Sequence, residues 1–284
     1  MADTVTSTPA SFIKKLSIPP GLIGPVLITA VVVGAHISFG ILDGWEKFAA
    51  ALSAAVVTEL FLHKMVTGNW RNLSSAYISG NSAGILVRSP MIWPFALCAA
   101  ISIASKYVFR YKGTHLWNPT NFGIVVMLLI ASDSMAVLSI QWGSNMWAML
   151  AIWIVGLLVI SKVKLFHVCA VYIVSFVGFA WLRSVLTDSV FITEVAPLTG
   201  PMYQLFVLFM ITDPKTTLST KKGRMTVAFL IAFVEFFFRM GEAVYAPFYA
   251  LFIVGPIALI WEKWREDREP SESFSSAVPN TGRV

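Results

Sequence analysis

The most informative feature of this 284-residue sequence is how little charge it carries. Asp, Glu, Lys and Arg make up 13% of the residues, hydrophobic residues make up 57%, and the mean hydropathy is +0.74. Water-soluble domains contain about 25% charged residues, so this chain lacks the polar side chains needed to cover a globule in water. Its long apolar runs therefore predict an all-α polytopic membrane protein.

Cysteine and the motifs of soluble enzymes are also scarce. The two cysteines, Cys98 and Cys169, lie in apolar runs and form no Cys-x-x-Cys pair, which argues against a disulfide framework or a cysteine metal site. The sequence has no phosphate-binding loop, nucleophile elbow, His-Glu-x-x-His motif or dinucleotide fingerprint. ATP-driven and hydrolytic chemistry therefore have no support, and no catalytic or metal-ligating residue is predicted.

Apolar runs of about 20 residues can cross a membrane as helices. The long runs are at residues 20–42, 47–65, 91–108, 144–161, 165–184, 225–241 and 245–262. Shorter runs, which contain Gly, Pro or small polar residues, are at 76–88, 118–132 and 196–212. Counting all of them as crossings predicts about ten transmembrane helices, with the shorter runs forming short or broken half-helices.

The distribution of positive charge supports this count. With the N-terminus in the cytoplasm, all but four of the 21 Lys and Arg fall in cytoplasmic segments, as the positive-inside rule requires. The four exceptions are Lys47, Arg88, Arg183 and Arg239. The net charge of +6 therefore reflects membrane topology rather than nucleic-acid binding. We expect a multi-pass protein of the cell inner (plasma) membrane, in contact with lipid, with both termini cytoplasmic.

The ten crossings divide into two halves of five. The first repeat spans residues 20–132 and the second spans 144–262, after a cytoplasmic N-terminal segment at 1–19. Residues 263–284 are charged and then rich in Ser and Pro, which predicts a disordered cytoplasmic tail. Because five is odd, the second repeat would enter the membrane in the opposite orientation, giving a 5+5 inverted repeat.

Matching landmarks recur in the two halves. Arg110 ends a long apolar run and Pro119 follows nine residues later, whereas Arg239 precedes Pro247 by eight residues. Inverted repeats build their binding site near the midplane, from helices interrupted by Gly or Pro. The alternative is that membrane helices commonly begin with Pro and end with Arg, which requires no duplication.

The stretch KGTHLWNPTNFG predicts the start of one such helix. Asn118 is a favoured N-cap residue, and Pro119 is tolerated in the first helical turn, where its missing N–H has no partner to lose. A helix N-terminus carries partial positive charge and free N–H groups, so it can receive an anion, a carbonyl or the edge of a flavin. Pro197 and Thr199 predict a second short helix that enters from the opposite side.

Four segments carry a resemblance to a known family. These are SAGILVRSP, KYVFRYKGTHLWNPTNFG, FMITDPKTTLSTKKGR and GEAVYAPFYALFIVGP, which lie within about residues 50–262. In this order they resemble the RnfD proteins of Rnf electron-transport complexes and the related NqrB proteins of sodium-pumping NADH:quinone oxidoreductases. The resemblance implies ten helices in a 5+5 inverted arrangement, bound flavin, and partner membrane and soluble redox subunits in an ion-pumping complex.

One departure from that family concerns the cofactor. Its members attach FMN covalently to a Thr in a short motif ahead of the sixth helix, but the corresponding stretch here, QWGSNMWA, has no Thr and offers only Ser144. This argues against covalent FMN and leaves noncovalent FMN or riboflavin. The resemblance also implies that the TDPKT loop, with Thr212, Asp213 and Thr216, shapes a flavin or ion site; the alternative is a simple helix stop.

Small polar residues form the remaining candidates for cofactor contact. Ser82 lies in a run of small residues that could contact a ligand or could equally allow close helix packing. The candidate cofactor-binding residues are therefore Asn118, Pro119, Ser144, Thr199, Thr212, Asp213, Thr216 and Ser82.

Ionisable residues within apolar runs suggest an ion pathway. Glu59 lies four residues before His63, and Glu235 lies four residues before Arg239, so each pair shares a helix face. Ionisable groups at membrane depth are costly to bury and are commonly functional. Glu59 and His63 could relay protons, although His63 lies close to the membrane edge. Glu235 could instead simply neutralise Arg239.

Two functions of different classes follow. The first is a membrane-embedded electron-transport protein that binds a flavin noncovalently, and is at most one subunit of a redox-driven translocase. The second is a cofactor-free transporter or channel for a small solute with the same inverted-repeat fold, which the missing Thr favours. A third, lesser candidate is an accessory membrane protein of a biosynthetic cluster that has the same fold.

Overall fold

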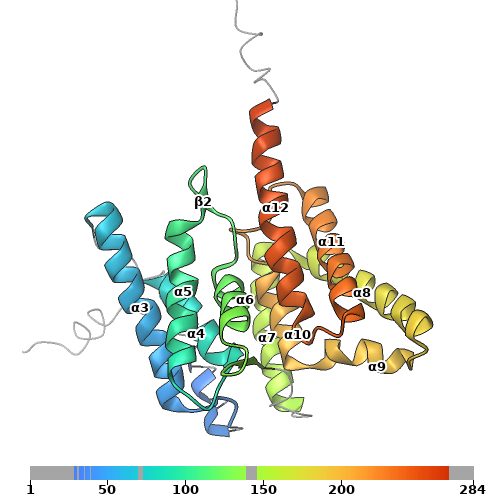
Figure 1. Cartoon of the computed structure of the whole chain (residues 1–284), viewed down its shortest axis with the longest axis horizontal. Coiled ribbons are helices and arrows are strands. Elements are labelled where there is room, and N and C mark those ends of the chain that lie inside the picture. Colours follow the sequence, from blue (N-terminus) through green and yellow to red (C-terminus); the bar gives the residue numbers. More distant parts are fainter. Residues whose placement is uncertain are drawn as a thin grey trace, which may run out of the picture.

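The protein is a bundle of helices (Figure 1). The structure is a computed structural model that describes residues 29–30, 32–34, 36–38, 40–69, 73–138 and 146–268. Its longer helices are α3 (Trp45–Thr67), α4 (Ser74–Leu86), α5 (Trp93–Val108), α6 (Pro119–Ile130), α7 (Met146–Val163), α8 (Phe166–Thr187), α11 (Lys221–Met240) and α12 (Ala246–Arg268). The mostly helical content confirms the predicted fold class in its broad form.

Three of the described helices, α3, α8 and α12, are long and apolar enough to cross a membrane. The surface of α8 supports this, because Val174, Trp181 and Val185 are all more than half exposed on one face. Large apolar side chains in that arrangement suit lipid rather than water. The composition and these helices together indicate a membrane protein, while the ten crossings and the inverted repeat stay predictions.

Helices that are too short to span a bilayer occupy the three short predicted runs. α4 has 13 residues and α6 has 12, which at the usual rise give about 20 Å each, against a hydrocarbon core of about 30 Å. The third run is interrupted: after α9 (Phe191–Val195) come a 3₁₀ turn, η2 (Ala196–Thr199), then α10 (Pro201–Leu205) and a π-helical turn, η3 (Phe206–Met210). Pro197 and Pro201 stand at the first turns of η2 and α10.

The glycines of α4 serve packing rather than interruption. The helix continues through Gly80 and Gly84 without a break. A Cβ at Gly80 would lie 2.9 Å from the Cα of Leu52, and one at Gly84 would lie 2.6 Å from the Phe48 ring. The small residues around Ser82 therefore let α3 approach α4 closely, as the packing alternative predicted.

The helices form two groups that meet near the centre of the molecule (Figure 1). In the first group, α3 packs on α4 and α5, and α5 packs on α6. In the second, α11 packs on both α8 and α12. The groups touch where α6 packs on α12, which brings the Asn118-Pro119 segment against the C-terminal helix.

Two short antiparallel ladders depart from the all-α prediction. β1 (Val87–Arg88) pairs with β4 (Ala136–Val137), and β2 (Arg110–Tyr111) pairs with β3 (Thr114–His115). The β2–β3 turn places Lys112 and Gly113 at positive φ, 50° and 79°, as two-residue hairpins require. The β1–β4 ladder gives backbone partners to the chain that leaves α4, where no helix can supply them.

The contact between α5 and α6 provides a test of the packing. A Cβ at Gly123 of α6 would lie 2.1 Å from Ser102 Oγ and 2.6 Å from the Cys98 carbonyl oxygen, so the backbone of α5 would have to move. We expect Gly123→Ala to lower the free energy of unfolding by about 1–3 kcal/mol. The measurement is thermal unfolding in detergent, followed by tryptophan fluorescence.

Gly178→Ala on α8 is the matched control. No atom lies within 4 Å of a Cβ at Gly178, so the same substitution should be neutral or slightly stabilising. Equal unfolding temperatures for the two variants would contradict the packing of α6 on α5.

Candidate functional site

The first candidate site is the contact of α6 with the second group of helices. Asn118 caps α6 as predicted: its Oδ1 accepts the Asn121 N–H at 3.1 Å. Its Nδ2 donates to Asp213 Oδ2, also at 3.1 Å. The Asn-Pro and TDPKT motifs are 95 residues apart in sequence, and this hydrogen bond brings them together.

Trp117 and Asn121 strengthen the same contact from α6 to α12. Pro256 lies inside α12, and because it has no N–H it leaves the Phe252 carbonyl without its usual helical donor. The indole N–H of Trp117 donates to that carbonyl at 2.8 Å. The Asn121 side chain donates to the Phe248 carbonyl one turn earlier, at 3.2 Å. Trp117, which precedes the Asn-Pro pair, thus supplies the hydrogen-bond donor that Pro256 cannot provide within α12.

Most polar groups around this contact are hydrogen-bonded within the protein, and Asn121 Oδ1 is buried without a partner among the described residues. The Thr212 hydroxyl donates to the Leu208 carbonyl at 2.7 Å, and the Thr216 N–H donates to the Asp213 carbonyl at 3.2 Å. Pro119 is buried beside Asn118. Five of the predicted cofactor residues therefore lie close together, and the bonds between them make this cluster a joint between the two groups of helices.

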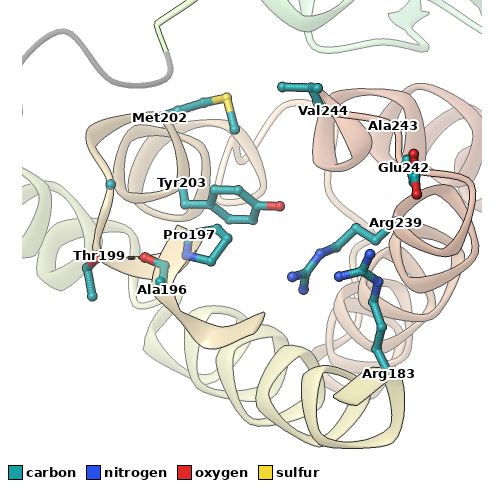
Figure 2. Close-up of a pocket in the computed structure, with 11 residues that line it drawn as sticks. Arg183, Ala196, Pro197, Thr199, Met202, Tyr203, Arg239, Glu242, Ala243 and Val244 are labelled. Carbon is teal, nitrogen blue, oxygen red and sulfur yellow. Dashed lines mark hydrogen bonds between the residues drawn. The ribbon is translucent and has the colours of Figure 1, made fainter. Parts of the chain in front are cut away.

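The second candidate site is a pocket of about 550 Å³ in the second group (Figure 2). Figure 2 shows the guanidinium groups of Arg183, from α8, and Arg239, from α11, pointing into it opposite the ring of Tyr203 and Pro197. The full lining is Arg183, Ala196, Pro197, Thr199, Gly200, Met202, Tyr203, Arg239, Glu242, Ala243 and Val244. Of the predicted cofactor residues that the structure describes, Thr199 lines this pocket.

One carboxylate serves both arginines of the pocket. Glu194 Oε2 accepts hydrogen bonds from Arg183 and, at 2.9 Å, from Arg239, which also donates to the Glu194 carbonyl at 2.7 Å. Burial raises the pKa of Glu194, but the hydrogen bonds from Arg183 and Ser189 and the charges of both arginines outweigh it and hold the pKa below its usual value. Two cations share this one anion, and the other carboxylate of the pocket, Glu242, is exposed, so the half-buried side of the pocket keeps a positive charge.

One donor atom of Arg183 is left without a partner in the described part of the chain. The Nε of Arg183 is buried and has no hydrogen-bond partner among the described residues. Guanidinium groups bind phosphates and carboxylates through paired hydrogen bonds. The geometry and the charge therefore suit an anionic ligand that also presents a flat group to Tyr203.

Glu235 lies directly behind the pocket. It is fully buried on α11, and its carboxylate accepts hydrogen bonds from the hydroxyls of Tyr172, at 2.5 Å, and Tyr203, at 2.7 Å. The expected alternative, in which Glu235 neutralises Arg239, is not what the structure has. Arg239 binds Glu194 instead and lies 4.6 Å from the centre of the Phe176 ring.

Glu59 is fully buried as well, but its surroundings differ. Its carboxylate lies 2.9 Å from the Lys106 ammonium and accepts a 2.8 Å hydrogen bond from the Tyr107 hydroxyl. Lys106 also donates to Ser75 Oγ at 3.1 Å. His63, the predicted relay partner, faces Tyr107 with ring centres 6.4 Å apart. The Glu59 charge is thus matched by a lysine that the sequence pattern did not indicate.

Several residues that form these sites were not predicted from the sequence. They are Lys106, Tyr107, Tyr172, Arg183, Glu194 and Tyr203. A usable signal existed, because Arg183 and Arg239 are two of the four cations that violate the predicted charge distribution. The other two are also bound within the protein: Lys47 pairs with Asp43 at 3.1 Å, and Arg88 donates to the carbonyls of Val87 and Ile41.

The remaining predicted residues lie elsewhere. Ser82 is half-buried on α4, in the first group of helices, and Ser144 falls outside the described residues. Among the residues that the structure describes, no group of three or more His, Cys, Asp or Glu could hold a metal ion. No protein-family model matches the chain, and no curated protein matches it. The family resemblance therefore stays a prediction.

The Glu59–Lys106 pair provides a test of buried charge. Removing one partner of a buried ion pair leaves the other charge uncompensated, so we expect Lys106→Met to reduce the free energy of unfolding by about 3–5 kcal/mol. Adding Glu59→Gln to that variant should recover much of the loss, because it removes the unpaired charge. Thermal unfolding in detergent measures both effects.

Lys112→Met is the control for this test. Lys112 pairs with Asp267 at the protein surface, where both side chains are more than a third exposed, and water already screens the interaction. The unfolding temperature should not change. If the Lys106 and Lys112 variants behaved alike, the buried pair would have no special role in stability.

Proposed function

We propose that this protein is a membrane-embedded electron-transport protein of the type represented by RnfD in Rnf complexes and by NqrB in sodium-pumping NADH:quinone oxidoreductases. It binds a flavin noncovalently and works within a redox-driven, ion-translocating complex, in which other membrane and soluble subunits supply the electrons. The observation that carries the proposal is the pocket in which two guanidinium groups face the ring of Tyr203.

The residues of this pocket fit FMN. A volume of about 550 Å³ lies within the usual range for small-molecule sites, about 300–1,000 Å³. Arg183 and Arg239 would hold the phosphate through the guanidinium groups that point into the pocket (Figure 2). Tyr203 and Pro197 present flat surfaces to the ring system. Bound flavin would supply a carrier that accepts and releases electrons, and the arginines favour FMN over riboflavin.

The arrangement of the helices supports a 5+5 inverted repeat as part of this proposal. The packing of α3 on α5 in the first group corresponds to that of α8 on α11 in the second, and α5 on α6 corresponds to α11 on α12. Figure 1 shows that α5 runs up to the β2 hairpin, whereas α11 runs down to its turn into α12, which then climbs to the end of the described chain. These opposite directions support the proposed repeat, in which ten crossings of the inner membrane would leave both termini in the cytoplasm.

Cysteine accessibility tests this topology. Both native cysteines are buried, so Asp133→Cys and Ser219→Cys introduce exposed thiols at defined positions. The proposed crossings place residues 133 and 219 on opposite sides of the membrane. A membrane-impermeant maleimide applied to whole cells should label only Asp133→Cys.

Two further variants serve as matched controls for the labelling. Thr187→Cys should behave like Asp133→Cys, and Lys112→Cys should behave like Ser219→Cys, because each pair is separated by an even number of proposed crossings. Labelling of 133 and 219 from the same side would rule out the ten-crossing arrangement.

A cofactor-free transporter or channel for a small solute is the second candidate. It is favoured by the same positive pocket, which could hold a small anion, and by the absence of Thr from residues 141–148. The two functions make different predictions about the purified protein, since only one of them includes a chromophore.

The visible absorption of the purified full-length protein distinguishes these functions. We expect a flavin band that is released into solution on denaturation, because no Thr is present to form the ester. Arg183→Met should weaken FMN binding by about tenfold or more, as expected for a lost charge-assisted hydrogen bond. Riboflavin, which has no phosphate, should not respond to the substitution.

Arg110→Met, at the β2–β3 hairpin, is the control for charge removal outside the pocket. The absence of any flavin band, together with anion flux into liposomes that Arg183→Met abolishes, would overturn the redox proposal in favour of a transporter.

A further inference from the structure

The two buried carboxylates are neutralised in different ways. Glu59 has the ammonium group of Lys106 at 2.9 Å. Glu235 is equally buried, but within the described part of the chain no Lys or Arg forms an ion pair with it. Two tyrosine hydroxyls stabilise a buried carboxylate only in part, because they bring no net charge to offset its desolvation. Binding a proton is the remaining way to neutralise Glu235.

A single hydroxyl connects Glu235 to the pocket. Tyr203 lines the pocket and at the same time donates to Glu235 Oε1 at 2.7 Å. Figure 2 shows the Tyr203 hydroxyl directed into the space between the ring and the two arginines. Tyr172 bonds the other oxygen of the same carboxylate but does not line the pocket. The route from the pocket to Glu235 therefore passes through Tyr203.

We propose that Glu235 is a proton-binding site that exchanges its proton with the pocket through the hydroxyl of Tyr203. In the inward direction, a water or ligand donor in the pocket gives a proton to the Tyr203 oxygen as the Tyr203 O–H proton passes to the Glu235 carboxylate. The tyrosine ends as it began, and the net change is one proton moved from the pocket to the carboxyl group. No oxidant or reductant takes part.

The surrounding groups couple this proton to the charge of the pocket. On α11, the charged residue near Glu235 is Arg239, one turn further on. Arg239 is in turn paired with Glu194 of α9. From α8 and α10 come Tyr172 and Tyr203, whereas α12 brings Tyr249 near Phe238, and no hydrogen bond joins it to Glu235. An anion that binds Arg239 reduces the positive potential at Glu235 and so favours its protonation. Anion binding in the pocket is therefore accompanied by proton uptake.

Infrared difference spectroscopy of the full-length protein in detergent tests the proton-binding site directly. We expect a C=O stretch of a protonated carboxyl group in an apolar environment, which disappears as the pH rises. Glu235→Gln should remove this band, and Glu59→Gln should leave it in place, since Glu59 is paired with the ammonium group of Lys106. A band that survives in Glu235→Gln, or no such band in the unmodified protein, would overturn the proposal.

The exchange of that proton for deuterium tests the route. Transfer of the protein into D₂O should shift the band, and Tyr203→Phe should slow the shift by roughly a hundredfold, because a positioned proton carrier is lost. Tyr172→Phe is the matched control, since it removes a hydrogen bond to the same carboxyl group without touching the pocket. Equal rates in the two variants would exclude Tyr203 as the route; unfolding temperatures show whether both variants are folded.

The coupling of proton and anion rests on the proposed pocket, but its test does not require a flavin. Adding inorganic phosphate to the purified protein should strengthen the protonated-carboxyl band in the unmodified protein and not in Arg183→Met. A protein that shows the Glu235 band and contains no flavin would refute the electron-transport function and keep the proton site. A protein that binds flavin and lacks the Glu235 band would refute the proton site and keep the electron-transport function.

Discussion

Every charged group inside an apolar helical bundle must find a partner, and this constraint shapes both halves of the structure. Glu59 takes Lys106, Glu194 is shared by two arginines, and Lys47 takes Asp43. The pairs join residues from different helices in most cases, so they also fix how the helices pack. Glu235 is the exception, because its partners are uncharged hydroxyls. One of these hydroxyls belongs to Tyr203, which lines the pocket. The proton site that we propose thus lies where the rule of paired charge is relaxed.

The same constraint acts on the backbone where the two groups of helices meet. Pro256 leaves the Phe252 carbonyl without a donor, and Trp117 supplies one from the opposite group. Asn118 both caps its own helix and holds Asp213 of the following group. Because the Trp117 donor comes from the other group, the hydrogen bonding of α12 is complete only when the two groups are in contact. The contact between the two groups is therefore held by polar bonds as well as by apolar packing, whereas the pocket and Glu235 both lie in the second group and are linked by the Tyr203 hydroxyl.

The helices and the helix start at Asn118 could be predicted from the sequence, but the side-chain partners that lie far apart in the chain could not. Apolar runs predicted the helices, and the types of residue at 118 and 119 predicted a capped helix start, because capping depends on neighbours within one turn. The same reasoning favoured Glu235 as the neighbour of Arg239 at one helical turn, yet Arg239 binds Glu194, which is 45 residues away. The small residues of α4 illustrate a further limit. Whether Gly80 breaks a helix or admits another helix depends on the approach of Leu52, which no local pattern contains.

The two buried carboxylates differ in whether their charge can change. Lys106 stands near the end of α5 that leads to the β2 hairpin, whereas Glu235 stands near the end of α11 that turns into α12, so the two lie toward opposite ends of the bundle (Figure 1). A carboxylate held by a permanent ammonium ion cannot change its charge without a large loss of stability. A carboxyl group held by hydroxyls can, because it gains or loses a proton while its hydrogen-bond partners stay in place. The ion pair of Glu59 thus stabilises the first group of helices, and Glu235 in the second group is left able to carry the proposed charge-changing site.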